Sequence, residues 1–194
     1  TLLPWLDIAG LSVFAASGAL AAAHKRLDFV GACFFALITA TGGGTLRDLL
    51  IGAPVFWMES AIPIALCVVV AAATWIIPLR YWPERALDWL DAAGLAAYAV
   101  FGAAKALQFG VEPVSSIAAG VVTACIGGVI RAVTAGAPSV LLRHELYVTA
   151  ALAAATVFIL MTLAGTGLHV SAVAGFVTGF IVRGAAIRWK IALP

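Results

Sequence analysis

The fold of this chain is decided by a stretch that occurs twice. Residues 39–54 read TATGGGTLRDLLIGAP, and residues 123–138 read TACIGGVIRAVTAGAP. The similarity extends outward from there without a gap, so that residues 7–61 align with residues 91–145. Aspartate, arginine, proline and paired glycines coincide in this alignment, which is harder to obtain by chance than matching alanines. We therefore interpret the chain as an internal duplication.

The composition indicates that lipid is the solvent of this chain. Hydrophobic residues make up 64% of the 194 residues, charged residues make up 10%, and the mean hydropathy is +1.12. Soluble globular domains contain about 45–50% apolar and about 25% charged residues. The net charge is only +2 and no run of Lys or Arg occurs, which excludes nucleic acid as a partner.

Seven apolar segments follow one another along the chain, separated by short polar or proline-containing stretches. A bilayer core is about 30 Å thick and is crossed by about 20 helical residues. The sequence therefore predicts an all-α membrane protein with seven transmembrane helices in a single transmembrane domain, residues 1–194. The predicted spans are residues 3–23, 29–51, 60–79, 90–108, 113–136, 146–166 and 169–188.

Each copy of the duplicated sequence contains three spans, over about 3–79 in repeat one and about 90–166 in repeat two. Because three is an odd number, the second copy must be inverted in the membrane relative to the first. We expect two inverted three-helix repeats plus one extra C-terminal helix, about 169–188. Transport paths usually run through the junction of such repeats.

The basic residues predict the orientation, since Lys and Arg gather in short cytoplasmic loops. The first apolar run has no basic residue before it and is interpreted as a span rather than a cleaved signal. We expect the N-terminus outside and the C-terminus in the cytoplasm. In the seven-span arrangement the cytoplasmic side then holds Lys25, Arg26, Arg80, Arg85, Arg143, Arg188 and Lys190.

The glycines of the repeated motif predict where the function lies. Gly42, Gly43 and Gly44 fall inside the second span, and Gly127 and Gly128 fall inside the fifth. Each glycine weakens a helix by roughly 1 kcal/mol relative to alanine. We expect both helices to be kinked or broken there, so that freed backbone groups line a path for an ion or solute. Alternatively, the glycines only permit close helix packing.

Charged residues stand beside these glycines at membrane depth, where a charge costs several kcal/mol unless it lines a cavity or has a partner. Asp48 can pair with its neighbour Arg47. Arg131 has Ala132 in the corresponding place, so it could face water, a lipid phosphate, or Asp48 or Asp7. Alternatively, both arginines snorkel to a membrane interface.

Seven further polar residues are candidates for lining or gating a pore: Ser17, Thr39, Thr41, Thr123, Asp7, Asp91 and Lys105. Plainer roles remain open, because a lysine can snorkel, an aspartate can favour a helix N-terminus, and a hydroxyl can bond its own helix. Arg183, near the end of the last span, is expected to be an interfacial anchor.

No metal site or cofactor is predicted. The histidines lie near span ends, and the cysteines lie inside apolar stretches without ligand spacing. We find no nucleophile with a base, no HExxH motif and no paired catalytic carboxylates at membrane depth, so the chain is not expected to be an enzyme. The expected partners are membrane lipids, including a bound lipid, and, as the family resemblance of the repeated motif implies, transient monovalent cations.

Residues 42–57, GGGTLRDLLIGAPVFW, followed by GGVIRAVTAGAP at 127–138, resemble the bacterial trimeric intracellular cation (TRIC) channel family, whose repeat is also called a glycine transporter domain. The resemblance implies a homotrimer in the bacterial inner membrane, with a potassium-permeable pore in each protomer lined by kinked second and fifth helices. The alternative function is a secondary transporter of a small solute such as glycine. The pore residues that the resemblance implies are Gly42, Gly43, Gly44, Arg47, Asp48, Gly127, Gly128 and Arg131. The family usually has an acid after the second arginine, where this chain has Ala132.

Overall fold

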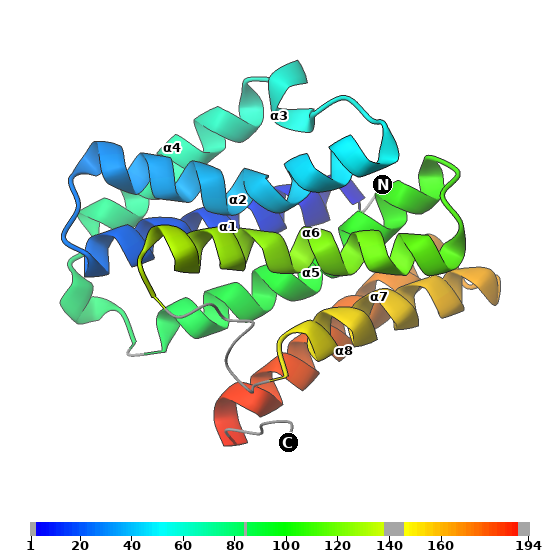
Figure 1. Ribbon diagram of the computed structural model, residues 1–194. Coiled ribbons are helices and arrows are strands. Elements are labelled where there is room, and N and C mark those ends of the chain that lie inside the picture. The colour runs from blue at the N-terminus through cyan, green and yellow to red at the C-terminus, as the bar shows by residue number, and fades with distance from the viewer. Residues whose placement is uncertain (1–2, 84, 138–145, 190–194) are drawn as a thin grey trace.

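The computed structural model describes residues 3–83, 85–137 and 146–189, and these ranges contain helices and no β-strand. The long helices run across the molecule in one bundle (Figure 1). In chain order the helices are α1 (Leu3–His24), α2 (Phe29–Ile51), α3 (Phe56–Glu59), α4 (Ile62–Ile76), the 3₁₀ helix η1 (Leu79–Tyr81), α5 (Ala86–Gln108), α6 (Pro113–Thr134), α7 (Val148–Leu163) and α8 (Leu168–Trp189).

Each predicted span overlaps one main helix, and these seven helices of the described residues differ in length. Five of them are long and apolar enough to cross a membrane, namely α1, α2, α5, α6 and α8. Helices α4 and α7 have 15 and 16 residues, which is about 22–24 Å at 1.5 Å per residue. The prediction of an all-helical multi-pass membrane protein is therefore confirmed, whereas the count of seven spans stays a prediction.

Three predicted spans extend past their helices, and in the third and sixth a local breaker ends the helix three residues early. Ile77, the last residue before Pro78, is already extended, since proline disfavours a helical residue ahead of it. In the sixth span, α7 ends at Leu163, and Gly165 takes a positive φ of 81°. The fixed φ of proline and the freedom of glycine thus set these two boundaries.

The Gly-Ala-Pro motif at the end of each duplicated stretch is a helix terminator. Gly52 follows α2 with φ 69°, and Gly136 stands just after α6 with φ 61°. The next residue folds back in both places, because the Ala53 N–H donates to the carbonyl of Asp48 at 2.8 Å and the Ala137 N–H donates to that of Ala132 at 2.9 Å. Left-handed glycine is the usual way to end a helix with such bonds.

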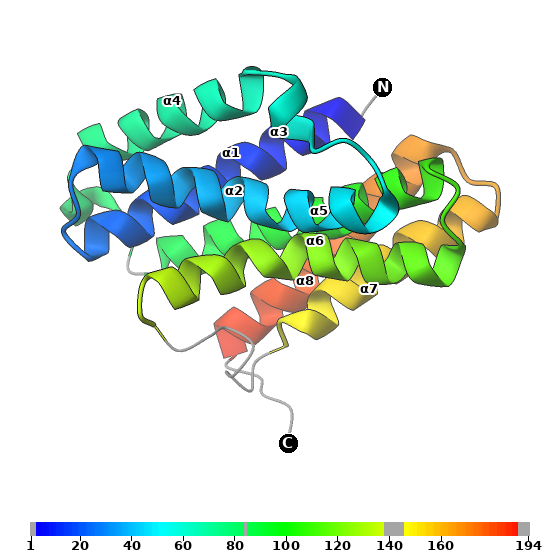
Figure 2. The ribbon, with the colours of Figure 1, turned by 45° about the horizontal axis from the view of Figure 1, so that its top comes forward.

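Four helices form the centre of the bundle. Helix α1 packs against α2 and α5, and α6 packs against α2 and α5. Helix α4 covers α1 and α2, while α7 covers α5 and α6, and α8 lies against α5 and α7 (Figure 2). The buried side chains of this core are mostly alanines, which lets the helix backbones come close together.

The predicted breaks in the second and fifth spans are wrong. Helix α2 stays α-helical across Gly43, and α6 stays α-helical across Gly127. A Cβ atom on Gly43 would clash with the carbonyl oxygen of Thr123, and one on Gly127 would clash with that of Thr39. The two glycines therefore let the backbones of α2 and α6 touch, and packing outweighs their weak helix propensity.

The basic residues used to predict orientation gather at one end of the bundle. Lys25 and Arg26 lie in the α1–α2 connection, and Arg85 precedes α5 at the same end (Figure 1). Arg85 Nη1 donates to the carbonyl of Ile187 in α8 at 2.8 Å, which places the end of α8 there too. Arg143, His144 and Lys190 lie outside the described residues, as does Pro138 of the second Gly-Ala-Pro motif.

Candidate functional site

The last turns of α2 carry a buried ion-pair cluster, called here the Asp48 cluster (Asp7, Arg47, Asp48 and Lys105). Asp48 Oδ1 lies 2.7 Å from Arg47 Nη2 and 2.8 Å from Lys105 Nζ, and it accepts a 2.9 Å hydrogen bond from Arg47 Nε. Its other oxygen accepts a hydrogen bond from the Phe56 N–H at 3.1 Å. The Asp48 side chain is 0% exposed and that of Arg47 is 2% exposed. The predicted pairing of Arg47 with Asp48 is confirmed.

Two further helices complete the Asp48 cluster. Lys105 comes from α5, and its side chain, 19% exposed, turns to Asp48. Asp7 comes from α1 and interacts electrostatically with Arg47 and Lys105. The Arg47 guanidinium also lies 5.1 Å from the ring centre of Phe101 in α5. The cluster thus joins α1, α2 and α5, and its two positive charges are matched by two negative ones.

A second cluster, called here the Asp91 cluster (Ser17, Asp91, Arg131 and Tyr147), surrounds the other arginine. Arg131 Nη1 lies 2.9 Å from Asp91 Oδ1 and donates to Ser17 Oγ at 2.6 Å. The Arg131 and Asp91 side chains are 5% and 3% exposed. The expectation that Arg131 faces water, lipid, Asp48 or Asp7 is wrong, because Arg131 forms its ion pair with Asp91 of the adjacent helix α5.

The two aspartates that were expected to favour helix N-termini have other roles. Asp91 lies in the second turn of α5 and is buried in the ion pair with Arg131. No acid stands in the first turn of α1 as described, and Asp7 instead interacts with the cations of the Asp48 cluster. The duplication already indicated that these aspartates lie near the arginines, because Asp7 matches Asp91 and Arg47 matches Arg131.

Sequence reasoning missed Tyr147 and misjudged Arg183. Both are buried, and the Arg183 guanidinium lies 5.1 Å from the centre of the Tyr147 ring. Arg183 is therefore not an interfacial anchor. The available signal was the spacing of Gly175, Gly179 and Arg183, since residues four apart share a helix face. A Cβ on Gly175 or Gly179 would press on Ala154 of α7, so this face of α8 points inward.

The hydroxyls between the clusters are mostly bonded to their own helices. Thr41 Oγ1 donates to the Leu37 carbonyl at 2.7 Å, and Thr123 Oγ1 donates to the Ala119 carbonyl at 2.6 Å. Thr39 is buried at the contact of α2 and α6, and its Oγ1 has no hydrogen-bond partner among the described residues. The backbone-bonded alternative thus holds for Thr41 and Thr123 in this conformation.

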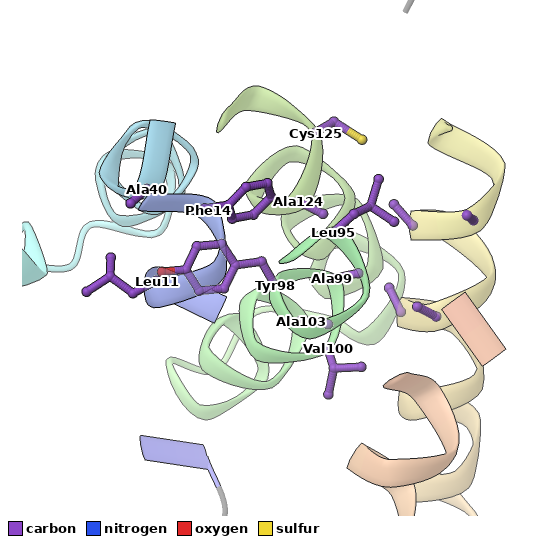
Figure 3. Packing of buried hydrophobic residues seen from close by; sticks show 14 of the residues in the cluster. Leu11, Phe14, Ala40, Leu95, Tyr98, Ala99, Val100, Ala103, Ala124 and Cys125 are labelled. Carbon is purple, nitrogen blue, oxygen red and sulfur yellow. The ribbon is translucent and has the colours of Figure 1, made fainter. Parts of the chain in front are cut away.

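Two aromatic rings lie at the contact of α1 and α5. The rings of Phe14 and Tyr98 are 5.3 Å apart between centroids and lie side by side in the packed core (Figure 3). A Cβ on Gly10 would meet the Tyr98 ring at 2.8 Å, and one on Gly94 would meet the Phe14 ring at 3.1 Å. The glycines of α1 and α5 therefore make room for these rings inside the protomer.

The two clusters occupy matching places in the duplicated sequence and opposite ends of the bundle. Helices α2 and α6 run in opposite directions, and each arginine stands near the end of its helix (Figure 1). Arg47 packs on Phe101, and Arg131 bonds Ser17, which is the residue that the duplication aligns with Phe101. The arginine of each half therefore contacts a residue of the other half, and the two contacted residues are aligned with each other in the duplication.

These features define a multi-pass helical membrane protein. Each end of its core holds an arginine whose charge is offset by an aspartate, and glycines let the core helices pack closely. The family model described as Glycine transporter matches residues 4–78 and again residues 88–163. The UPF0126 inner membrane protein YadS of Escherichia coli strain K12 is 36% identical and aligns over 98% of this chain and 94% of its own. A UPF0126 membrane protein of Vibrio cholerae is 35% identical over 100% of this chain and 82% of its own.

Solved structures give the same relation. The TRIC trimeric intracellular cation channel orthologue from Rhodobacter sphaeroides is 42% identical, with a TM-score of 0.93 over 98% of this chain and 100% of its own. A prokaryotic TRIC channel studied in 0.5 M KCl is 27% identical, with a TM-score of 0.91 over 99% and 98%. This chain belongs to the TRIC family, to which the glycine transporter description also applies. These structural relatives are ion channels rather than enzymes, so the prediction that the chain is not an enzyme is confirmed.

Proposed function

We propose that this protein is a monovalent cation channel, permeable to potassium, and that it forms a homotrimer with one pore in each protomer. Its relatives of known structure support this, since they are TRIC cation channels and one of them is described as trimeric. The observation that carries the proposal is the pair of charge-neutralised arginine clusters at opposite ends of one helical core.

The proposed path runs between two inverted repeats. The first is α1, α2 and α4 within about 3–79, the second is α5, α6 and α7 within about 90–166, and α8 is the added seventh helix. The two matches of the family model to one chain support this division. The N-terminus lies outside and the C-terminus in the cytoplasm, as the positions of the basic residues suggest. The Asp48 cluster then faces outward and the Asp91 cluster faces inward.

Charge neutralisation is what makes a cation path past two arginines feasible. Two like unit charges 4 Å apart repel by about 4 kcal/mol at an effective dielectric constant of 20. An aspartate oxygen lies 2.7 Å from Arg47 and 2.9 Å from Arg131, so each positive charge is offset where it stands. A passing potassium ion would therefore meet local dipoles rather than an uncompensated positive field.

We take the described conformation as the closed state of this channel. The central hydroxyls and rings are packed, and both Arg–Asp ion pairs are buried. Opening would separate α2 from α6 at the contacts of Gly43 and Gly127, which are the places where the two backbones touch. The proposed path residues are Gly42, Gly43, Gly44, Arg47, Asp48, Gly127, Gly128 and Arg131, with Ser17, Thr39, Thr41, Thr123, Asp7, Asp91 and Lys105 as lining or gating residues.

Lipid is a further proposed partner, and a bound lipid is the one cofactor-like group expected. Large apolar side chains stand exposed on the outside of the bundle, among them Val30, Met58 and Ile76, which are 73%, 73% and 77% exposed. In the membrane such side chains lie against acyl chains or against a neighbouring protomer. Native mass spectrometry of the protein extracted with its lipids would identify both the trimer and any lipid that stays bound.

Recording from purified protein in planar bilayers tests the channel proposal. Under a potassium chloride gradient we expect unitary current steps that reverse near the potassium equilibrium potential. The description of the family model favours a second candidate, a glycine carrier, which would open the two clusters alternately. Saturable uptake of labelled glycine into proteoliposomes, with no unitary steps, would replace the channel by this carrier.

A further inference from the structure

The Asp91 cluster is tied to α8 through residues outside the duplicated segments. Tyr147 precedes α7, and Arg183 lies in the last turns of α8. Their side chains are buried together, with the Arg183 guanidinium 5.1 Å from the centre of the Tyr147 ring. A buried arginine in a membrane protein costs several kcal/mol and is normally retained only where it serves a structural or functional role.

The Tyr147 hydroxyl occupies the space that Gly128 leaves empty. A Cβ on Gly128 would clash with Tyr147 Oη and would lie 3.1 Å from Asp91 Oδ1. The hydroxyl and the carboxylate therefore share one small space beside α6. In the first half the matching residue is Gly44, and there the space is filled by the ring of Phe56, whose Cε1 would be 2.7 Å from a Cβ. Only the second half places a polar group against its glycine.

The contacts continue from Asp91 to the other side of the core. Asp91 pairs with Arg131, and Arg131 donates to Ser17 of α1. A chain of contacts thus runs from α8 through the start of α7, α5 and α6 to α1. At the same end of the bundle, Arg85 Nη1 donates to the Ile187 carbonyl and fixes α8 to the start of α5.

We propose that Arg183 and Tyr147 are positioning residues through which α8 holds Asp91 against Arg131 and keeps this end of the core closed. The guanidinium holds the tyrosine ring, and the ring holds its hydroxyl beside the carboxylate. A shift of α8 would therefore be transmitted to the Arg131–Asp91 pair. The consequence for conduction rests on the proposed channel function, whereas the positioning itself does not.

Two native thiols report on this positioning without any ion flux. Cys125 is 5% exposed and lies in α6, three residues before Gly128, which faces Tyr147 and Asp91. Cys67 is 1% exposed and lies in α4, which packs on α1 and α2 instead. Cys33 is changed to alanine, so that N-ethylmaleimide labelling, followed by mass spectrometry of the full-length protein in proteoliposomes, compares the two remaining thiols.

Tyr147→Phe and Arg183→Gln are each expected to speed the labelling of Cys125 at least tenfold and to leave Cys67 unchanged. The double variant is expected to match the single ones, because the two changes break successive links of the same chain of contacts to Asp91. Arg188→Gln is the matched control, since Arg188 is exposed on the same helix and should leave both rates unchanged. Unchanged Cys125 labelling in both variants, or a joint rise at Cys125 and Cys67, would overturn the proposal. Absence of currents from the wild-type protein would instead overturn only the channel function.

Discussion

A methyl group added at the contact of α2 and α6 should push the two helices apart. In Gly43→Ala the new Cβ would clash with the Thr123 carbonyl oxygen, and in Gly127→Ala it would clash with that of Thr39. Ordinary contact begins near 3.4 Å, so the backbones must separate by about 1 Å or more. Overpacking of this kind typically costs about 1–3 kcal/mol.

That cost applies to whichever state keeps the contact. If the described conformation is the closed state, each alanine destabilises the closed state and raises the ratio of open to closed channels about 5- to 150-fold, since 1.4 kcal/mol is a factor of ten. The midpoint of thermal unfolding should fall by about 2–12 °C, at about 2–4 °C per kcal/mol for a chain of this size.

Single-channel recording gives the open probability, and thermal unfolding in detergent gives the stability. Gly167→Ala is the control, because nothing lies within 4 Å of a Cβ at Gly167 and its φ is not positive. An open probability that stays at the wild-type level in both alanine variants, or falls, would show that the helix contact does not belong to the closed state. Unchanged stability would show that the contact is not tight at all.

Three further predictions concern the charges and the topology. Arg131→Gln should lower the free energy of unfolding by about 3–5 kcal/mol, because it leaves Asp91 buried without its cation. Arg47→Gln should cost less, because Asp48 keeps Lys105, and equal losses in thermal unfolding would contradict this order. Ala132→Asp should destabilise by several kcal/mol, and Ala21→Lys added to it should recover part of that loss in the same assay; no recovery would show that the matching positions do not meet. Cysteine at Glu112 should react with an impermeant thiol reagent on intact cells and cysteine at Lys25 only after permeabilisation, whereas equal labelling of both would refute the orientation.

The helices could be predicted from sequence wherever local signals agree with burial. The second span was predicted as residues 29–51 and is found as Phe29–Ile51. Asp28 caps its start by accepting a hydrogen bond from the Gly31 N–H at 2.7 Å, and Gly52 ends it. Such capping is encoded in adjacent residues and can be read without a partner helix.

The glycine breaks could not be predicted correctly from propensity alone. A glycine that weakens a helix and a glycine that admits a neighbouring backbone look the same in one sequence. The difference lies in the Thr123 and Thr39 carbonyls, which belong to another helix. Tertiary contact decided the outcome, and the helices stayed continuous.

The site was predicted where its partners are adjacent in sequence and missed where they are not. Arg47 and Asp48 are neighbours, and their pair was expected. Asp91 and Arg131 are on different helices, and Arg183 of α8 contacts Tyr147, which precedes α7. Only helix arrangement creates these contacts, although the duplication had already aligned the two Arg–Asp sets.

The missing acid at Ala132 is explained by a second difference between the halves. Asp48 is held by Lys105, and the duplication aligns Asp48 with Ala132 and Lys105 with Ala21. The site at one end of the bundle therefore has both the acid, from the first half, and its lysine, from the second half, and the aligned site at the other end has neither. A single acid at position 132 would add a buried negative charge with no cation to match it, which is more costly than having no charge there. Each half thus keeps one neutral Arg–Asp set, while the Asp48–Lys105 pair at one end and the Tyr147–Arg183 contact at the other give the two ends different ways to hold their arginine.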